Sequence, residues 1–281
     1  MKVIKTASEV RDWSRSEQQK GCSIGLVPTM GFLHEGHLSL IRKAKTVSDK
    51  VIVSIFVNPT QFAQGEDLDK YPIDIQGDLS KCQTEGVDAV FIPDNNEMYS
   101  DLHQTYVINQ EIGQLLCGAS RPTHFRGVNT VVAKLFNLID PDFAVFGQKD
   151  AQQSIIIKNM VRDLSYRTQI LVEPIIREKD GLAMSSRNKY LNPQQRKNAL
   201  ILSQSINLAY SKVKSGNRNF TNLEKEITEN VNTLPECKVD YVEFVNADTL
   251  HKKFAKGDKV LLAIAVFVGT TRLIDNAIIT I

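Results

Sequence analysis

The feature that most constrains the fold is a continuous apolar, largely β-branched run, VIVSIFV, at residues 51–57. A run of this kind, without polar alternation, is typical of a strand covered on both faces in a parallel sheet. Other strand patterns alternate with helix patterns along the first part of the chain. The strand patterns lie at residues 22–27, 87–92, 143–146 and 169–176, and the helix patterns at 34–47, 127–139 and 151–162. This alternation predicts right-handed crossovers and an α/β, Rossmann-like parallel sheet.

The pattern changes after residue 176. Asn192, followed by a proline, predicts the start of a helix that runs to about Lys214. Thr6 with Glu9, and Thr221 with Glu224, have the spacing of capping boxes and predict two further helix starts. Strand-like runs then follow at residues 239–245, 259–268 and 277–281. We therefore expect a Rossmann-like domain over residues 1–176, and a smaller α+β C-terminal domain over residues 177–281 that closes over the ligand site.

Composition excludes several classes of protein. The net charge of +2 gives no bulk field that would hold a nucleic acid or a membrane surface. The four cysteines form no CxxC pair, which disfavours a zinc site and a disulfide framework. The longest apolar run, Val260–Val268, is shorter than the roughly 20 residues that a membrane-spanning helix needs. The N-terminal segment lacks the apolar core of a signal peptide, so we expect a cytoplasmic protein.

The segment Pro28–His37, PTMGFLHEGH, lies between a predicted strand and a predicted helix. His34 and His37 are three residues apart, on one face of the helix start, and Gly36 lets a ligand approach the backbone. Free N–H groups at a helix start favour phosphates, and two imidazoles there can donate hydrogen bonds to a reacting phosphate. A helix start with two partly exposed histidines would have the same pattern. A metal site is disfavoured, because no third His or Cys is near in sequence.

Polar side chains also follow two other predicted strands. Asn58 and Gln61, in NPTQF, are uncharged hydrogen-bonding groups that suit a substrate with hydroxyls and a carbonyl. Lys149 is a point charge suited to phosphates, and Asp150 beside it could cap the next helix or bind a ribose. A simple turn in the first case, and a capped helix with a surface lysine in the second, remain alternatives.

A fourth polar segment, REKDGLAMSSRN, covers residues 177–188. Ser185, Ser186 and Arg187 can surround a triphosphate, since arginine offers a forked pair of donors. The segment lies at the expected domain boundary, so hinge motion could close it over a nucleotide. An ordinary polar loop would look the same.

These motifs occur in an order that resembles a known family. His-x-Gly-His after the first of these strands resembles the HIGH signature of the nucleotidyltransferases and class I aminoacyl-tRNA synthetases. The longer strings PTMGFLHEGH, NPTQF, RPTHFRGV, GQKD and MSSR are together similar to the pantothenate synthetases, the pantoate–β-alanine ligases. The similarity spans nearly the whole chain, although residues 193–260 carry little signature. Residues 269–276 also resemble the end of the family, and we assign them no chemical role.

The resemblance implies an ATP-dependent ligase that forms pantothenate, AMP and pyrophosphate from pantoate and β-alanine through a pantoyl-adenylate, in pantothenate and coenzyme A biosynthesis. It implies Mg²⁺ with ATP. We expect the phosphates to hold most of the metal, because Mg²⁺ keeps waters and favours phosphate oxygens, with Asp78 as a first- or second-shell partner. Gln61, Gln153 and Asn58 are the expected substrate ligands. The residues expected to act in catalysis are His37, His34, Lys149, Ser185 and Arg187. Those expected to bind ATP are Met30, Gly31, Phe32, Leu33, His34, Glu35, Gly36, His37, Gly147, Gln148, Lys149, Asp150, Ile176, Met184, Ser185, Ser186 and Arg187.

Two other functions remain open from the sequence. Another adenylyl- or cytidylyltransferase of the same fold would keep His-x-Gly-His and lack the glutamines and NPTQF. A non-catalytic nucleotide-binding module would not need Lys149 and Arg187. We expect small-molecule partners, ATP, pantoate and β-alanine, with neither a nucleic acid nor a membrane. The resemblance further implies a homodimer.

Overall fold

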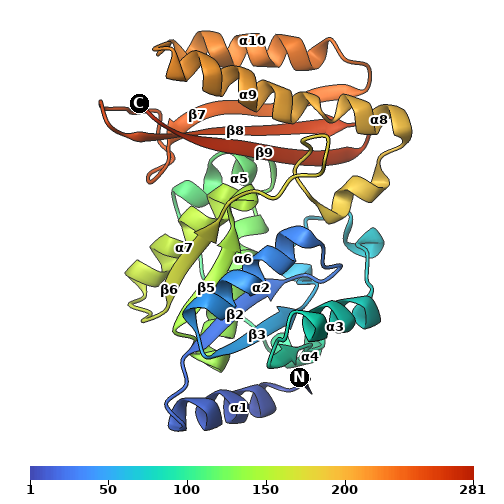
Figure 1. Cartoon of the computed structure of the whole chain (residues 1–281), viewed down its shortest axis with the longest axis vertical. Coiled ribbons are helices and arrows are strands. Elements are labelled where there is room, and N and C mark those ends of the chain that lie inside the picture. Colours follow the sequence, from blue (N-terminus) through green and yellow to red (C-terminus); the bar gives the residue numbers. More distant parts are fainter.

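The computed structural model describes all of residues 1–281. The first part of the chain forms a six-stranded parallel sheet in the order β1-β4-β3-β2-β5-β6. Figure 1 labels β2, β3, β5 and β6 among these strands. The expected run at 51–57 supplies a central strand, which is buried along almost all of its length. The strands are β1 (Lys2–Ile4), β2 (Ile24–Thr29), β3 (Lys50–Ile55), β4 (Ala89–Phe91), β5 (Phe143–Gly147) and β6 (Gln169–Glu173).

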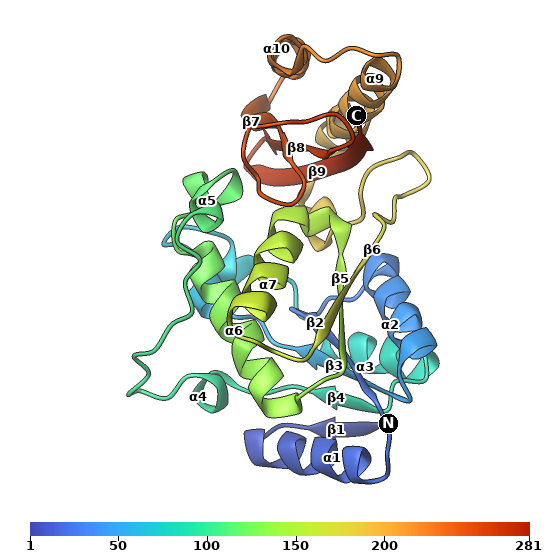
Figure 2. The same ribbon diagram turned by 90° about the vertical axis from the view of Figure 1, so that its left-hand side faces the viewer.

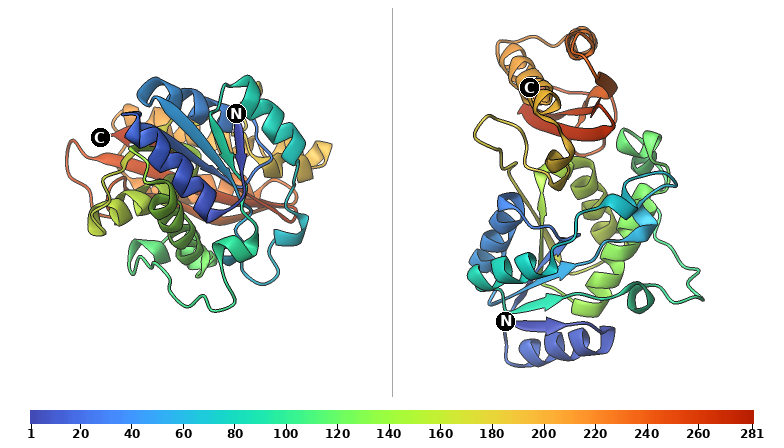
Figure 3. Two further views of the ribbon diagram at one scale, coloured as in Figure 1. Left: turned by 90° about the horizontal axis from the view of Figure 1, so that it is seen from below. Right: turned by 90° about the vertical axis from the view of Figure 1, so that its right-hand side faces the viewer.

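Helices cover both faces of this sheet, which is why its inner strands β2 to β5 are largely apolar and buried. One face carries α1 (Ala7–Gln19), α6 (His124–Ile139) and α7 (Ala151–Asp163), and the other carries α2 (Glu35–Val47) and α3 (Ile75–Thr84) (Figure 2). The view on the right of Figure 3 shows the same three layers from the opposite side. Short helices are α4 (Asn95–Met98), α5 (Cys117–Ser120), η1 (Pro59–Gln61), η2 (Leu68–Lys70), η3 (Ile112–Gln114) and η4 (Gln148–Asp150).

The strand order reverses between β2 and β5. Strand β2 pairs in parallel with β3 on one side and with β5 on the other. From β2 the chain builds outward to β3 and β4, and then returns to β5 and β6 on the opposite side. In such sheets the loops at the carboxyl ends of the two strands diverge and leave a crevice for ligands. The fold therefore places the segment after β2 next to the segment after β5.

The second part of the chain is a three-stranded antiparallel sheet of β7 (Cys237–Asn246), β8 (Lys259–Val268) and β9 (Thr271–Thr280). Helices α9 (Ile201–Lys214) and α10 (Phe220–Asn232) cover its outer face, and its inner face lies over the first part (Figure 1). Alternate residues of β8 serve the two faces: Leu262 and Ile264 join the cluster beneath α9 and α10, whereas Leu261 and Ala263 join the core of the first part. The two parts thus share apolar packing, and the division at residue 176 stays a prediction.

Several predicted boundaries were wrong. The helix expected from Asn192 to Lys214 is two helices, α8 (Pro193–Asn198) and α9. Between them Leu200 bonds back to Lys197 in a tighter turn. The box of Thr221 and Glu224 is not used. Helix α10 begins at Phe220, and the Asn219 side chain caps it by accepting from the N–H of Asn222.

Other helix starts agree better with the sequence. The box of Thr6 and Glu9 forms as expected, and Asn192 caps α8 as expected. The extent of the strands and of one helix differs from the prediction: α6 begins at His124, β6 ends at Glu173, β9 begins at Thr271, and the short edge strand β1 was missed.

Candidate active site

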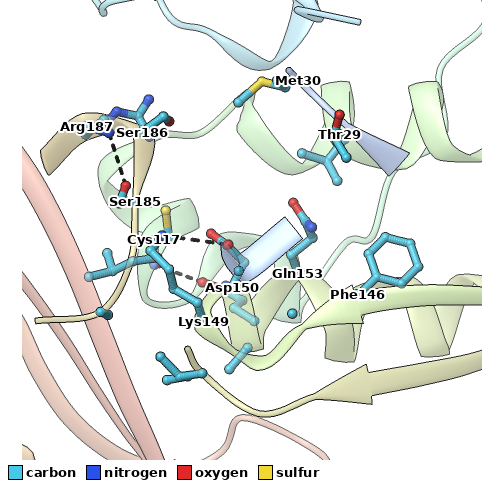
Figure 4. A pocket seen from close by; sticks show the side chains of 18 of the residues that line it. Thr29, Met30, Cys117, Phe146, Lys149, Asp150, Gln153, Ser185, Ser186 and Arg187 are labelled. Atoms are coloured by element: carbon cyan, nitrogen blue, oxygen red, sulfur yellow. Dashed lines mark hydrogen bonds and ion pairs between the residues drawn. The ribbon is translucent and has the colours of Figure 1, made fainter. Parts of the chain in front are cut away.

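A cavity of about 270 Å³ opens at the carboxyl ends of β2, β3 and β5, with the second part of the chain as its roof. Figure 4 shows side chains from separate segments facing it, with Met30 above, Lys149 and Asp150 below, and the 185–187 segment on the left. Most of the expected site residues line it: Met30, His34, Gly36, His37, Asn58, Gln61, Gly147, Lys149, Asp150, Gln153, Ile176, Met184, Ser185, Ser186 and Arg187.

The two histidines form the start of α2. Nδ1 of His34 accepts a hydrogen bond from the N–H of Gly36 at 3.1 Å, and Nδ1 of His37 accepts one from the N–H of His34 at 3.3 Å. The rings stand 4.1 Å apart between centroids. Because both Nδ1 atoms accept, each neutral ring carries its proton on Nε2. The cap therefore leaves two N–H donors for the cavity.

Both imidazoles are held neutral. Desolvation in the cavity wall lowers the pKa of His34 to about 4, and the positive charge of Lys149 acts in the same direction. Desolvation also lowers the pKa of His37 well below its usual value, helped by His34 and Lys149. Near neutral pH the pair therefore acts through hydrogen-bond donation, and Lys149 carries the positive charge beside it.

The turn after β3 fixes Gln61 from several sides. Its main-chain oxygen accepts from His124 at 2.9 Å and from Arg121 at 3.3 Å, and its side-chain oxygen accepts from the Asn58 amide at 3.1 Å. Its side-chain nitrogen approaches the sulfur of Met30 at 2.8 Å. Sulfur is a weak acceptor, so a substrate oxygen in the cavity can replace it.

Asn58 makes hydrogen bonds within the protein in place of the direct substrate contact expected from the sequence. The residue is buried, and its amide nitrogen donates to Gln61 and to the main-chain oxygen of Gly127. Its oxygen accepts from the hydroxyls of Thr60 and Tyr99 at 2.9 Å each. All of its hydrogen-bonding groups are thus used within the protein, and Asn58 orients Gln61.

The segment after β5 presents Lys149 and Asp150. Lys149 Nζ lies 3.8 Å from the carboxylate of Asp150, which is half exposed and makes no capping hydrogen bond to α7. The expectation that Asp150 could cap the helix was therefore wrong, and its carboxylate is available to a ligand. Gly147 has an ordinary extended backbone with open space where a Cβ would stand, so its lack of a side chain leaves room in the cavity.

The roof segment is fastened to the loop after β3. Arg187 forms a two-pronged ion pair with Asp67, at 2.8 and 2.9 Å. The hydroxyls of Ser186 and Tyr71 lie 3.1 Å apart, and Ser185 caps η5 (Ser186–Tyr190) by accepting from the N–H of Arg187. The guanidinium expected to hold phosphate is thus paired with a carboxylate.

Comparisons with known proteins identify the family. A sequence model described as pantoate-beta-alanine ligase matches residues 2–278. The chain belongs to this ligase family. It is 55% identical to the pantothenate synthetase of Thermoanaerobacter sp. strain X514 over 276 residues, which are 98% of each chain. It is 50% identical to that of Moorella thermoacetica over 281 residues, 100% of this chain and 99% of the relative.

Solved structures of the family agree with the fold. The pantothenate synthetase of Thermus thermophilus superposes with a TM-score of 0.91 at 38% identity, covering 99% of both chains. The ligase of Francisella tularensis, solved as a complex with beta-gamma ATP and beta-alanine, superposes with a TM-score of 0.82 at 36% identity, covering 99% of this chain and 97% of that one. Membership of the family argues against the two other functions that the sequence left open, another adenylyl- or cytidylyltransferase and a non-catalytic nucleotide-binding module.

Some residues expected to bind ATP in this ligase lie outside the cavity wall: Gly31, Phe32, Leu33, Glu35 and Gln148. Asp78 lies outside it as well. Asp78 is fully buried, and its two oxygens accept from the N–H groups of Phe32 and Leu33 at 2.7 Å each. It therefore shapes the segment before α2, where Gly31 and Phe32 have positive φ. Both carboxylate oxygens of Asp78 are engaged by the backbone, and its role as a first- or second-shell partner of Mg²⁺ stays a prediction.

Sequence reasoning missed several residues that this ligase places at the site. Tyr71 lines the cavity, and Arg121 ties Gln61 to Glu66. Asp67 holds Arg187. The local signal was weak: Arg121 lies in the string RPTHFRGV, and Asp67 and Tyr71 lie in the segment at residues 66–72 that follows NPTQF. The partners in these contacts are more than 50 residues away in the chain.

Proposed function

We propose that this chain joins pantoate to β-alanine through a pantoyl-adenylate. The adenylate forms from ATP in the cavity between β2 and β5, where the strand order of the sheet reverses. The family of the chain carries out the ATP-dependent formation of pantothenate. One observation supports the mechanism above all: the two Nε2–H donors and Lys149 flank the same cavity that Gln61 and Gln153 line. A phosphate group and a hydroxyacid can therefore lie side by side.

In the first step the carboxylate of pantoate attacks the α-phosphorus of ATP, and the bond to pyrophosphate breaks. Charge grows on the phosphate oxygens, where His34 and His37 donate hydrogen bonds and Lys149 supplies positive charge. Ser185, Ser186 and Arg187 hold the outer phosphates once Arg187 exchanges Asp67 for the nucleotide. No protein nucleophile is needed, since the protein positions the reactants and stabilises charge.

In the second step the amine of β-alanine attacks the activated carbonyl of the adenylate. The carbon–nitrogen bond forms, AMP leaves with the bridging oxygen, and the amine loses a proton. Gln61 and Gln153 bind pantoate throughout, which keeps its carbonyl in place between the two steps. The Gln153 amide extends from α7 into the cavity (Figure 4).

Magnesium enters this scheme with ATP. The structure has no group of three His, Cys, Asp or Glu side chains that could hold a metal ion, and Asp78 is taken by the backbone. Mg²⁺ prefers phosphate oxygens and water to an all-protein cage. We therefore place Mg²⁺ on the phosphates of ATP.

We also propose a cytoplasmic homodimer. None of the helices is long and apolar enough to cross a membrane. The family resemblance supports the dimer, which light scattering tests directly. A mass near twice the 31.5 kDa of one chain supports it, and a mass near one chain contradicts it.

The function is tested by exchange of labelled pyrophosphate into ATP, with Mg²⁺ and without β-alanine. We expect exchange that depends on pantoate, because the first step is reversible and needs no amine. Addition of β-alanine should then produce AMP and pantothenate. If a folded sample that binds ATP shows no exchange but releases AMP only with β-alanine, the two steps are concerted and the adenylate proposal fails.

Changing Gln61 to alanine should raise the KM for pantoate about tenfold or more. A hydrogen bond to a neutral group contributes roughly 1 kcal/mol, and the buried Asn58 amide also loses its acceptor on Gln61. The KM for ATP should change little. Steady-state kinetics with each substrate varied in turn measures both. An effect confined to ATP would instead assign Gln61 to the nucleotide.

A further inference from the structure

Two adjacent polar residues of β9, Asp275 and Asn276, have no role in the chemistry above. Both are almost fully buried, with relative exposures of 2% and 4%. They lie on the edge strand of the second sheet, yet they line the same cavity as the substrate residues. Burying polar side chains is costly unless they are hydrogen-bonded, so their partners show what they hold in place.

Asn276 forms hydrogen bonds to the turn that carries Lys149. Its amide nitrogen donates to the main-chain oxygen of Gln148 at 2.9 Å and to that of Lys149 at 3.0 Å. Its side-chain oxygen accepts from the Gln148 side chain at 3.2 Å. This explains why Gln148 lies outside the cavity wall, although the sequence places it beside Lys149. Three hydrogen bonds from one side chain therefore fix η4 from the opposite sheet.

Asp275 holds, through Arg177, the start of the segment that carries Ser185 and Arg187. Its carboxylate pairs with both terminal nitrogens of Arg177, at 2.7 and 2.9 Å, and also accepts from the N–H of Asn276 at 2.8 Å. Arg177 further donates to the main-chain oxygen of Gly181 at 3.1 Å, which closes the hairpin that leads to Ser185.

The strand geometry explains how neighbouring residues reach two different segments. Successive side chains of a strand point to opposite faces of the sheet. Asn276 pairs in register with Ala263, which packs into the core of the first part, whereas Asp275 pairs with Ile264, which packs beneath α9. Asn276 thus faces the Lys149 turn, and Asp275 meets Arg177 from the other side of the edge strand.

We propose that Asn276 is a positioning residue for the nucleotide step, which sets Lys149 against the phosphates, and that Asp275 sets the Ser185–Arg187 segment from the same strand. The proposal rests on the proposed function of Lys149. The turn that carries Lys149 and the segment that carries Ser185 and Arg187 are then both held in position by two consecutive residues of one strand. A small displacement of β9 would move the two segments together relative to the histidines.

Replacing Asn276 with alanine tests the proposal. We expect the Kd for ATP, measured by calorimetry with Mg²⁺ and no pantoate, to rise about tenfold, because the turn that carries Lys149 loses its hydrogen bonds to Asn276. The KM for ATP should rise, kcat should fall, and the KM for pantoate should stay within about twofold. Asn276→Asp should be worse, since it places a carboxylate against two carbonyl oxygens.

The matched control is Asn246→Ala. Asn246 lies on β7 of the same sheet, and its side chain bonds only to residues 248, 249 and 258 of the second part. It should lower thermal stability as much as Asn276→Ala does, without changing the Kd for ATP. Equal losses of ATP affinity in both variants would reduce Asn276 to a general structural residue and overturn the proposal.

A double-mutant cycle with Lys149 shows whether Asn276 acts through it. If it does, Asn276→Ala should cost much less ATP affinity in a Lys149→Ala background than in the wild-type chain. Fully additive losses would contradict positioning through Lys149. These binding measurements need no turnover, so they are independent of the pyrophosphate exchange. Failure of that exchange with intact ATP binding would affect the proposed function and leave the positioning result interpretable.

Discussion

Replacing His37 with alanine lowers kcat by about 100-fold or more, the usual effect of losing one donor to a charge that develops in the transition state. The structure makes this loss specific. The Nδ1 atom of His37 is used by the main chain of His34, so only Nε2–H can face the phosphate, and the low pKa keeps the ring neutral. Steady-state kinetics and single-turnover formation of the adenylate measure the effect.

The control for this variant is His251→Ala, because His251 is exposed and lies outside the cavity. The variant also loses the hydrogen bond from the N–H of His34 to the His37 ring, which contributes about 1 kcal/mol of stability, so thermal unfolding must be followed in parallel. An undiminished kcat in a folded His37→Ala protein would remove His37 from the mechanism.

Replacing Gly127 with alanine should weaken pantoate binding, because Gly127 packs against the backbone of the turn that carries Gln61. Helix α6 approaches η1 so closely that a Cβ on Gly127 would meet the main-chain oxygen of Thr60 and lie 2.6 Å from the main-chain nitrogen of Gln61. Backbone atoms cannot move aside as a side-chain rotamer can, so α6 and η1 must separate. Asn58, which donates to the Gly127 oxygen, would then release Gln61.

We expect this variant to lose about 1–3 kcal/mol of stability, the usual effect of overpacking. The KM for pantoate should rise at least about tenfold, in line with the loss of the Gln61 hydrogen bond. Chemical denaturation and kinetics with pantoate varied measure the two effects. Gly113→Ala is the control, because a Cβ there meets ordinary contacts of 3.5 Å or more. Wild-type kinetics in Gly127→Ala would show that the turn tolerates the shift.

The order of secondary-structure elements in the first part could be predicted well from the sequence. Buried β-branched runs and helix periodicity are local properties, and they located strands β2 to β6 of the parallel sheet to within a few residues. Capping signals worked where nothing else competed, as at Thr6 and Asn192. They failed at Thr221, because Asn219 lies two residues earlier and offers a cap from its own side chain.

The candidate site divides in the same way. His34 and His37 could be recognised because a spacing of three puts both rings on one face of a helix start, and the structure adds that they cap each other. Gln61 and Lys149 could be placed because each follows a strand of one parallel sheet, and such strand ends meet at one edge. The uses of Asn58, Asp78 and Gln148 could not, since their partners come from other segments.

By itself the sequence determined the fold class, the family and the ends of the strands where chemistry takes place, because these depend on residues that are neighbours in the chain. The tertiary structure alone decided which polar side chains remain free for a ligand. Arg187 is paired with Asp67, and the Asp78 carboxylate accepts hydrogen bonds from the backbone. The turn that carries Lys149 is held by a hydrogen bond from Asn276. Hydrogen bonds act over about 3 Å. Whether a side chain is engaged therefore depends on residues 45 to 127 positions away, which only the folded chain brings within reach.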